Sequence, residues 1–440
     1  MILRTVYFWH DHCLIPCVGR GKPHAPAIIL PTGLKGKAMR LETQYQDEYT
    51  PRRQNLRADG RKKVAVFAGT RPEAIKVAPV VAALRRRPEH FDVCLCSTGQ
   101  HKEMLTQTFA DFGLRPDVSL NVMAPNQGLS GLSSVLFKEV GEFLTAYRPD
   151  VVLVQGDTTT VQVASLASFY ASIPVGHIEA GLRTWNITTP FPEELNRRVT
   201  GMVSRWHFAP TVSARRNLLR DAVPDEQIVV TGNTVVDALL MTLESIRANR
   251  PALPTRVEEA IAQQRDIILV TGHRRESFGR GIRDICQALT EIAKTLPEVR
   301  IVYPVHMNPN VRGPVFELLK DSPNIYLEDP LSHKAFVRLM EASRLILSDS
   351  GGVQEEGPTL GKPVLIMRDV TERPEGVENG VNMLVGIKPG NIITQTVRLM
   401  ADDVAYAAMS AKPNPYGDGH ASERIADILC RDVRILRRAA

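Results

Sequence analysis

Three carboxylates occupy positions where paired acid and base chemistry could occur. Asp157 directly follows the apolar run PDVVLVQG, and Glu179 ends the run IPVGHI. One strand–helix–strand step separates them, so we expect adjacent parallel strands to bring both to the same sheet edge. Two carboxylates on one edge can hold different pKa values and act as acid and base. Glu193 begins a helix behind Pro192. Taken singly, each carboxylate is also typical of a structural role at a helix start.

Arg71 and Lys76 lie near the end of another expected strand and indicate a binding site for an anion. Arg71 lies in the segment GTRPEAIK, where a helix should begin. An arginine at a helix N-terminus opposes the helix dipole unless an anion binds there, which makes a bound phosphate one of two equal interpretations. Lys76, one turn further on, would add positive charge. Thr70 and Glu73 have capping-box spacing, and we expect Glu73 to serve only the helix start.

The second half of the chain has three further strand ends rich in cations or small residues. A loop over 271–281, which contains His273, is dense in His, Arg and Gly and is typical of anion recognition. Small residues at 350–352 precede a helix and would let a phosphate approach, and a carboxylate nearby could bind ribose. The sequence has neither GxGxxG nor a Walker A motif, so NAD and ATP are not indicated. Together these ends predict a nucleotide diphosphate site, with the candidates Ser350, Gly351, Gly352, Glu356, Arg368 and Arg373.

Alternating strands and helices must position these groups. From residue 62 short β-branched runs alternate with helical stretches, a pattern that predicts buried parallel strands covered on both faces. The pattern restarts at DIILVTG, after the Pro-containing segment 247–256. We therefore predict an α/β protein with two Rossmann-like doubly wound domains. The expected ranges are an N-terminal extension over 1–60, a first domain over 61–232, a second domain over 233–415 and a last helix over 416–440 that could pack back on the first domain.

Composition agrees with an ordinary globular protein. The 440 residues are 43% hydrophobic and 23% charged, and no apolar run is long enough to span a membrane. The net charge of +6 is concentrated in residues 1–60, so the nearly neutral remainder argues against a nucleic-acid partner. Residues 1–60 are expected to be a disordered extension or upstream sequence, with Met39 as another candidate start. Six scattered cysteines favour a reducing, cytoplasmic location over a disulfide framework.

The motifs, in their order, resemble those of one bacterial family. They are GTRPEAIK, VQGDTTT, HIEAGLRT, PFPEELNRR, TGNTVVDALL, VTGHRRESFGRG, YPVHMNPNV, SDSGGVQEE, GKPVLIMRDVTERPE and NPYGDG. Over about 62–430 the chain is similar to the non-hydrolysing UDP-N-acetylglucosamine (UDP-GlcNAc) 2-epimerases. The resemblance implies two Rossmann-like domains facing across a cleft, as in GT-B-like glycosyltransferases. It implies reversible inversion at C2 to give UDP-N-acetylmannosamine (UDP-ManNAc), through elimination of UDP and a 2-acetamidoglucal, without a metal or redox cofactor.

The same resemblance implies roles for individual residues. Asp157, Glu179 and Glu193 would lie near the sugar, the first two carrying protons, and His273 would lie at the sugar diphosphate. Leu331 departs from the glutamine found in some members. A second UDP-GlcNAc would act as an allosteric activator bound by Gln100 and Gln127. The substrate-binding set would be Arg71, Lys76, Arg197, Phe336, Ser350, Gly351, Gly352, Glu356 and Arg373.

Other interpretations stay open at this point. A sister epimerase would use a UDP-2,3-diacetamido uronic acid, and a hydrolysing epimerase would release free N-acetylmannosamine. A glycosyltransferase of the same fold or an inactive UDP-sugar sensor would also fit part of the pattern. The family further suggests a homodimer that supplies cell-envelope polysaccharide.

Overall fold

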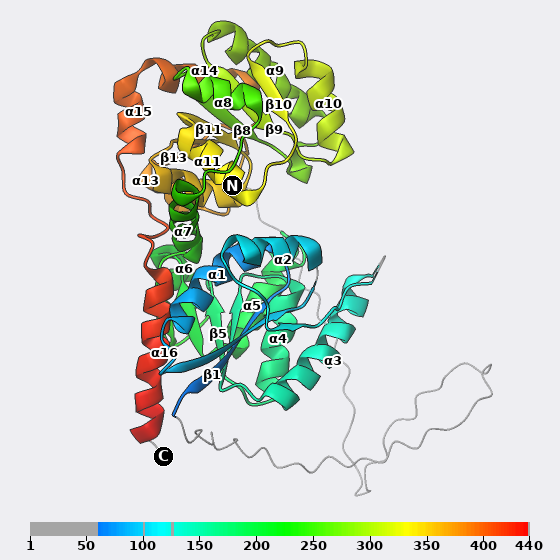
Figure 1. Cartoon of the computed structure of the whole chain (residues 1–440), viewed down its shortest axis with the longest axis vertical. Coiled ribbons are helices and arrows are strands. Elements are labelled where there is room, and N and C mark those ends of the chain that lie inside the picture. Colours follow the sequence, from blue (N-terminus) through cyan, green and yellow to red (C-terminus); the bar gives the residue numbers. More distant parts are fainter. Residues whose placement is uncertain (1–59, 100–101, 125–126, 439–440) are drawn as a thin grey trace, which may run out of the picture. The chain divides into compact units, whose positions relative to one another are not determined.

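Two parallel sheets with intervening helices form the architecture of the computed structural model, which describes residues 60–99, 102–124 and 127–438 (Figure 1). The first sheet has the strand order β3-β2-β1-β4-β5-β6-β7. Its strands are β1 (Lys62–Ala68), β2 (Phe91–Ser97), β3 (Val118–Ser119), β4 (Val151–Gln155), β5 (Val175–Ile178), β6 (Trp206–Ala209) and β7 (Ile228–Val230). Its helices are α1 (Arg71–Arg85), α2 (Lys102–Asp111), α3 (Leu129–Tyr147), α4 (Thr159–Tyr170), α5 (Glu193–Val203) and α6 (Val212–Arg220).

The second sheet repeats this plan in the order β10-β9-β8-β11-β12-β13. Its strands are β8 (Ile267–Thr271), β9 (Arg300–Pro304), β10 (Ile325–Glu328), β11 (Leu345–Ser348), β12 (Val364–Ile366) and β13 (Asn382–Leu384). Its helices are α8 (Thr255–Ala262), α9 (Arg280–Thr295), α10 (Pro309–Leu319), α11 (His333–Ala342), α12 (Gly351–Glu356), α13 (Pro374–Asn379), α14 (Pro389–Ala401) and α15 (Asp403–Ser410). The predicted fold class is thereby confirmed.

Strand order decides where a ligand can bind. In the first sheet β1 lies between β2 and β4, and in the second β8 lies between β9 and β11. At each of these points the order reverses, so the loops that leave the neighbouring strands diverge and open a crevice at the carboxyl edge. Arg71 follows β1 and His273 follows β8. The fold therefore places both residues at switch points, where doubly wound proteins bind their ligands.

The chain crosses between the two sheets twice. The first crossing leads from β7 into α7 (Thr234–Ala248), and the second leads from α15 into α16 (Ala421–Arg438). The two crossings touch, because the backbone N–H of Asn233 donates to the carbonyl of Tyr416 at 2.7 Å. Gly232 and Gly417 both have positive φ, and a Cβ on Gly232 would meet the Gly417 Cα at 3.3 Å. Larger side chains at these two glycines would separate the crossings.

The last helix returns to the first sheet. In Figure 1 α16 (red) runs beside α1 (blue). Ile425, Ala426 and Leu429 are fully buried in the same core cluster as β1 and α1. Asp237 of α7 accepts from the backbone N–H groups of Ser422 and Ala421, at 2.7 Å and 3.3 Å, and so holds the first turn of α16. The domain ranges predicted above stay predictions.

A few elements differ from the sequence expectation. The sequence pattern does not predict β3, α8, α13, α14 and α15. Strand β3 has two residues, too few for an alternating pattern to develop. Helix α8 begins directly after Pro254 in a segment rich in breakers, which masked its period. Most of the N-terminal extension, residues 1–59, lies outside the described residues. Among those described, no helix is long and apolar enough to cross a membrane.

Candidate functional site

The carboxylates expected on one edge do lie on adjacent strands. Strands β4 and β5 pair in parallel, with Gln155 opposite Ile178, so Asp157 and Glu179 follow neighbouring strand ends as predicted. The side-chain amide of Gln155 donates to Glu179 Oε2. Glu179 has φ +65°, a left-handed conformation that few non-glycine residues adopt. Such backbone geometry is often found at functional sites, where the surrounding contacts hold it in place.

Glu179 is held as an anion. Lys76 forms a buried ion pair with Glu179 Oε1, and the Asn233 amide donates to the same oxygen at 2.9 Å. Burial by itself would raise the pKa of Glu179, but the charges of Lys76 and Arg373 and these hydrogen bonds outweigh it and lower the pKa to about 2. The carboxylates of Glu179 and Glu355 in turn keep the pKa of Lys76 above its usual value, although burial acts against them.

Asp157 has the opposite tendency. Burial raises its pKa, the neighbouring charge of Arg197 opposes this, and the negative charge of Glu179 adds to the rise. Arg197 forms an ion pair with Asp157 Oδ2, and the Asn196 amide donates to the Asp157 carbonyl at 2.9 Å. Two carboxylates on one edge whose pKa values move apart are the arrangement that acid and base catalysis requires.

Glu193 begins α5, close to this pair. Its Oε2 atom is buried and has no hydrogen-bond partner among the described residues. Its negative charge also contributes to the raised pKa of Asp157. The third predicted carboxylate is therefore within electrostatic reach of Asp157.

A cavity of about 510 Å³ brings together residues that follow strands of both sheets. Asp157, Glu179, Glu193 and Arg197 are not among its lining residues, but Lys76 lines it and contacts Glu179. Leu331 lines it as well. Nine predicted substrate-site residues line the cavity: Arg71, Lys76, His273, Phe336, Ser350, Gly351, Gly352, Glu356 and Arg373.

Arg373 lies directly on the small-residue turn. A Cβ on Gly351 would stand 2.7 Å from Nη1 of Arg373, so this glycine is required for the close approach. Arg373 Nε donates to Glu355 Oε1 at 2.5 Å, and Lys76 Nζ lies 3.5 Å from Glu355 Oε2. Glu355 is buried, and its two oxygens connect Arg373, which precedes α13, with Lys76 of α1. Arg368, also predicted as a cation of this site, instead pairs with Glu276 at 2.5 Å.

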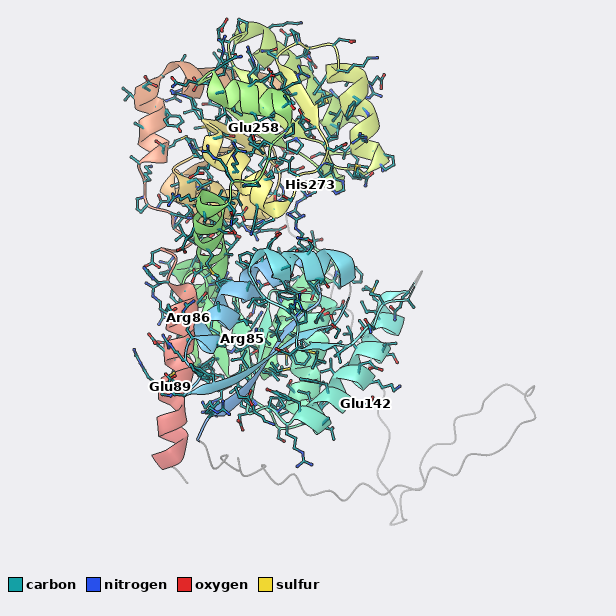
Figure 2. All side chains as sticks on the ribbon, viewed as in Figure 1. Arg85, Arg86, Glu89, Glu142, Glu258 and His273 are labelled. Atoms are coloured by element: carbon teal, nitrogen blue, oxygen red, sulfur yellow. The ribbon has the colours of Figure 1, made fainter. Side chains whose placement is uncertain are left out.

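The loop after β8 is fixed by a buried carboxylate. Asp349 Oδ2 accepts from the backbone N–H groups of His273 and Arg274 at 2.7 Å and 2.8 Å. The His273 ring stacks on His306 with centroids 5.3 Å apart. Burial lowers the pKa of His273, although the nearby carboxylate of Asp349 acts against this, so the surroundings favour the neutral ring. Figure 2 labels His273 in the part of the molecule that contains the second sheet.

One expectation about Glu73 is too narrow. Its Oε2 accepts from the backbone of Thr70 and Gly69, which is the predicted capping contact. Its Oε1 also accepts from the Thr158 hydroxyl at 2.7 Å, so Glu73 fixes the residue that follows Asp157. The contact joins residues 85 positions apart, which no local spacing reveals.

Some residues near the site are not predicted by the sequence pattern, and some predicted residues lie apart from the cavity. Glu355, Asn233 and Asp349 were not identified as site residues, although each lies within or beside a quoted motif. Gln100 lies outside the described residues. Gln127 accepts from the backbone of Ala124 at 3.1 Å and does not line the cavity.

Two Rossmann-like units with cations, a glycine turn and paired carboxylates at their carboxyl edges define a class of protein, the nucleotide-sugar enzymes of GT-B-like fold. The family model described as UDP-N-acetylglucosamine 2-epimerase matches residues 82–430. A protein of Escherichia coli K12 with that name is 50% identical over 370 residues, which are 83% of this chain and 98% of that protein. A probable UDP-N-acetylglucosamine 2-epimerase of Ralstonia solanacearum is 53% identical over 367 residues, 83% of this chain and 97% of that protein.

Solved structures agree with the sequence relatives. A Neisseria meningitidis UDP-GlcNAc 2-epimerase bound to UDP-GlcNAc has a TM-score of 0.77 and 45% identity, covering 84% of this chain and all of that chain. A Methanocaldococcus jannaschii UDP-GlcNAc 2-epimerase in complex with UDP-GlcNAc and UDP has a TM-score of 0.70 and 33% identity, covering 84% and 99%. The chain belongs to the UDP-N-acetylglucosamine 2-epimerase family, which confirms the resemblance carried by its ten motifs.

Proposed function

We propose that this enzyme interconverts UDP-GlcNAc and UDP-ManNAc by elimination and re-addition of UDP. A base removes the C2 proton, the bond from C1 to the diphosphate oxygen breaks, and UDP leaves with its electron pair. The resulting 2-acetamidoglucal accepts a proton at C2 on the opposite face, and UDP adds back at C1. One proton leaves C2 and another is added there, and the same UDP leaves and returns, so the cycle is redox-neutral and needs no oxidant or reductant.

One observation carries this proposal: two carboxylates on adjacent strand ends have pKa values that move in opposite directions. A weakly acidic C2 hydrogen requires a base on one face and a proton donor on the other. Asp157 and Glu179 supply one carboxyl group whose pKa is raised, which favours its protonated form, and one whose pKa is lowered, which favours its ionised form. Glu193 is the third carboxylate of the proposed catalytic group.

The departing diphosphate needs positive charge and hydrogen-bond donors. In the proposed binding mode Arg71, Arg373 and the turn Ser350–Gly352 hold the phosphates, with Lys76 beside the sugar. Arg197, which pairs with Asp157, lies on the side of the proposed catalytic carboxylates. His273 lies at the sugar diphosphate, Glu356 binds ribose hydroxyls and Phe336 packs against the uracil. We further propose a homodimer, activation by a second UDP-GlcNAc at Gln100 and Gln127, and a role in supplying cell-envelope polysaccharide.

A proton NMR time course of the purified protein with UDP-GlcNAc in D₂O tests the reaction. We expect UDP-ManNAc to appear and deuterium to enter C2 of both sugars. Free N-acetylmannosamine with UDP as the main products would identify a hydrolysing enzyme instead. No conversion would reject the proposed substrate and lead next to the 2,3-diacetamido uronic acid.

The Asp157→Asn variant tests the mechanism. It removes the proton-carrying group while keeping the side-chain shape, so we expect turnover to fall by at least about 10²-fold. UDP binding, measured by calorimetry, should stay within threefold of the wild-type value. Full activity in this variant would exclude Asp157 from the proton transfer.

A further inference from the structure

Asn233 contacts both a helix start and a proposed catalytic carboxylate. Its side chain is buried, with 2% of the residue exposed. The Oδ1 atom accepts from the backbone N–H of Val235 at 3.1 Å and caps α7, while Nδ2 donates to Glu179 Oε1 at 2.9 Å. One side chain therefore satisfies two groups that belong to different elements.

The choice of asparagine follows from the second of these contacts. A helix N-cap needs only an oxygen acceptor, which serine, threonine or aspartate supplies equally well. Aspartate has no donor, and a serine or threonine hydroxyl would have to accept and donate through one short oxygen, whereas an amide carries its acceptor and its N–H donor on two separate atoms. The cap alone would leave the residue type open, whereas the contact with Glu179 accounts for it.

Asn233 also lies at the contact between the two chain crossings. Its backbone N–H donates to the Tyr416 carbonyl at 2.7 Å. The Tyr416 hydroxyl donates to the carbonyl of Arg373 at 3.0 Å and accepts from the N–H of Gly376. A chain of contacts thus runs from Glu179 through both crossings to the backbone of a proposed phosphate-binding residue.

We propose that Asn233 is a positioning residue that holds the Glu179 carboxylate in place and ties it to the crossing between the two sheets. The inference rests on the proposed function, because it assumes that Glu179 takes part in the proton transfer. Asn233 acts through Glu179 and through the crossing, without contact to the reacting atoms.

The groups that face Glu179 determine what a substitution should do. They are Lys76 from α1, Gln155 from β4, His177 from β5, Arg373 ahead of α13 and Asp157 after β4. Replacing the Asn233 amide by a carboxylate would set a second negative charge against Glu179 Oε1. A like charge at this distance favours the protonated form, so the pKa of Glu179 should rise from about 2.

Two variants separate the cap from the contact with Glu179. Asn233→Asp and Asn233→Ser both keep an oxygen that can cap α7. Ionised aspartate has no donor for Glu179, and serine has only the short hydroxyl that makes the cap. We expect kcat to fall by about 10- to 100-fold in the serine variant, as for loss of a hydrogen bond to a charged group. In the aspartate variant the acidic limb of the pH profile of kcat/KM should move upward by more than about one pH unit.

The matched control is Asp402→Asn, which exchanges a carboxylate and an amide at the exposed N-cap of α15. It should leave the pH profile unchanged. Wild-type kcat and an unshifted profile in both Asn233 variants would overturn the inference, as would an activity loss fully explained by a lowered melting temperature. A Glu179→Gln variant with full turnover would instead overturn the proposed role of Glu179, so the two failures are distinguishable.

Discussion

Two adjacent glutamates in α12 show how strongly the surroundings of a residue decide its charge. Glu355 is buried between Arg373 and Lys76, which compensate its negative charge. Glu356 is also buried, and among its charged neighbours Glu355 has the largest effect on its pKa. Burial and the charge of Glu355 raise the pKa of Glu356 to about 7. Glu356, the residue proposed to bind the ribose, therefore changes its protonation state within the physiological pH range.

The raised pKa of Glu356 makes stability depend on pH. Between pH 4.5 and 7 the folded protein binds a proton that the unfolded chain releases, so this residue stabilises the fold at low pH and loses that effect as pH rises. Glu356→Gln removes the dependence. We expect the variant to gain about 3 kcal/mol in unfolding free energy relative to wild type between pH 4.5 and 7.

Urea unfolding of both proteins at several pH values measures this difference. Glu298→Gln, at an exposed side chain, is the control and should show no such trend. A difference between Glu356→Gln and wild type that stays constant with pH would contradict the prediction.

The sequence could predict site residues whose position depends on local structure. Asp157 and Glu179 were found because each directly follows a recognisable strand. Asn233 and Glu355 were not, because their significance depends on partners 54 positions away, in Glu179, and 279 positions away, in Lys76. Only the folded sheets bring such pairs together, and no spacing in the chain encodes the contact.

At the scale of elements, α7 and α16 meet through a buried cap. Asp237 lies in the first turn of α7 and accepts from two N–H groups at the start of α16. The N–H groups at a helix start have no partner within the helix. A carboxylate from another helix therefore both satisfies them and fixes where the last helix begins.

Substitution of Asp237, which caps α16, should destabilise the protein more than loss of an exposed ion pair made by a residue of α16. Asp237→Ala removes both contacts and should cost about 1–2 kcal/mol. Glu423→Ala removes the exposed pairing with Arg86 (labelled in Figure 2) and with Arg87, and should cost less than about 1 kcal/mol. Thermal unfolding of both variants measures the order. An equal or smaller effect at Asp237 would show that α16 does not depend on this cap.

The elements themselves were predicted to the extent that they are long and regular. Buried strands such as β4 and β8 are continuous apolar runs, and helix α3 has an uninterrupted amphipathic period. Short elements gave no such signal. Helix α13 has six residues and begins at Pro374, so its start resembles a turn as much as a helix.

Across the whole molecule, buried neutral histidines are a shared feature of both sheets. Burial lowers the pKa of His177 to about 3 and of His207 and His333 to about 4. His177 and His207 lie opposite each other on β5 and β6, and His333 begins α11. All three are uncharged in the folded protein at pH values where they would be protonated in an unfolded chain.

These histidines should make the fold sensitive to acid. A lowered folded pKa means that stability is complete above about pH 6.5 and is lost as pH falls toward the folded values. Each histidine should cost about 2 kcal/mol by pH 5. Glu356 acts in the opposite direction, because its raised pKa stabilises the fold as pH falls. Its contribution is smaller than the sum of the three histidine contributions.

Urea unfolding at pH 7.5 and pH 5 measures the loss, and His207→Gln should reduce it by about 2 kcal/mol. Equal stability of the wild-type protein at the two pH values would contradict the prediction.

The return of α16 to the first sheet has a consequence for synthesis on the ribosome. Strands β1 to β7 are made first, but Ile425, Ala426 and Leu429 complete the core around β1 and α1. The domain that is begun first is therefore finished last, after the second sheet has emerged. A chain that stops before residue 421 would leave the α1 face of this core uncovered. Chaperones and proteases could recognise an incomplete product by that apolar surface.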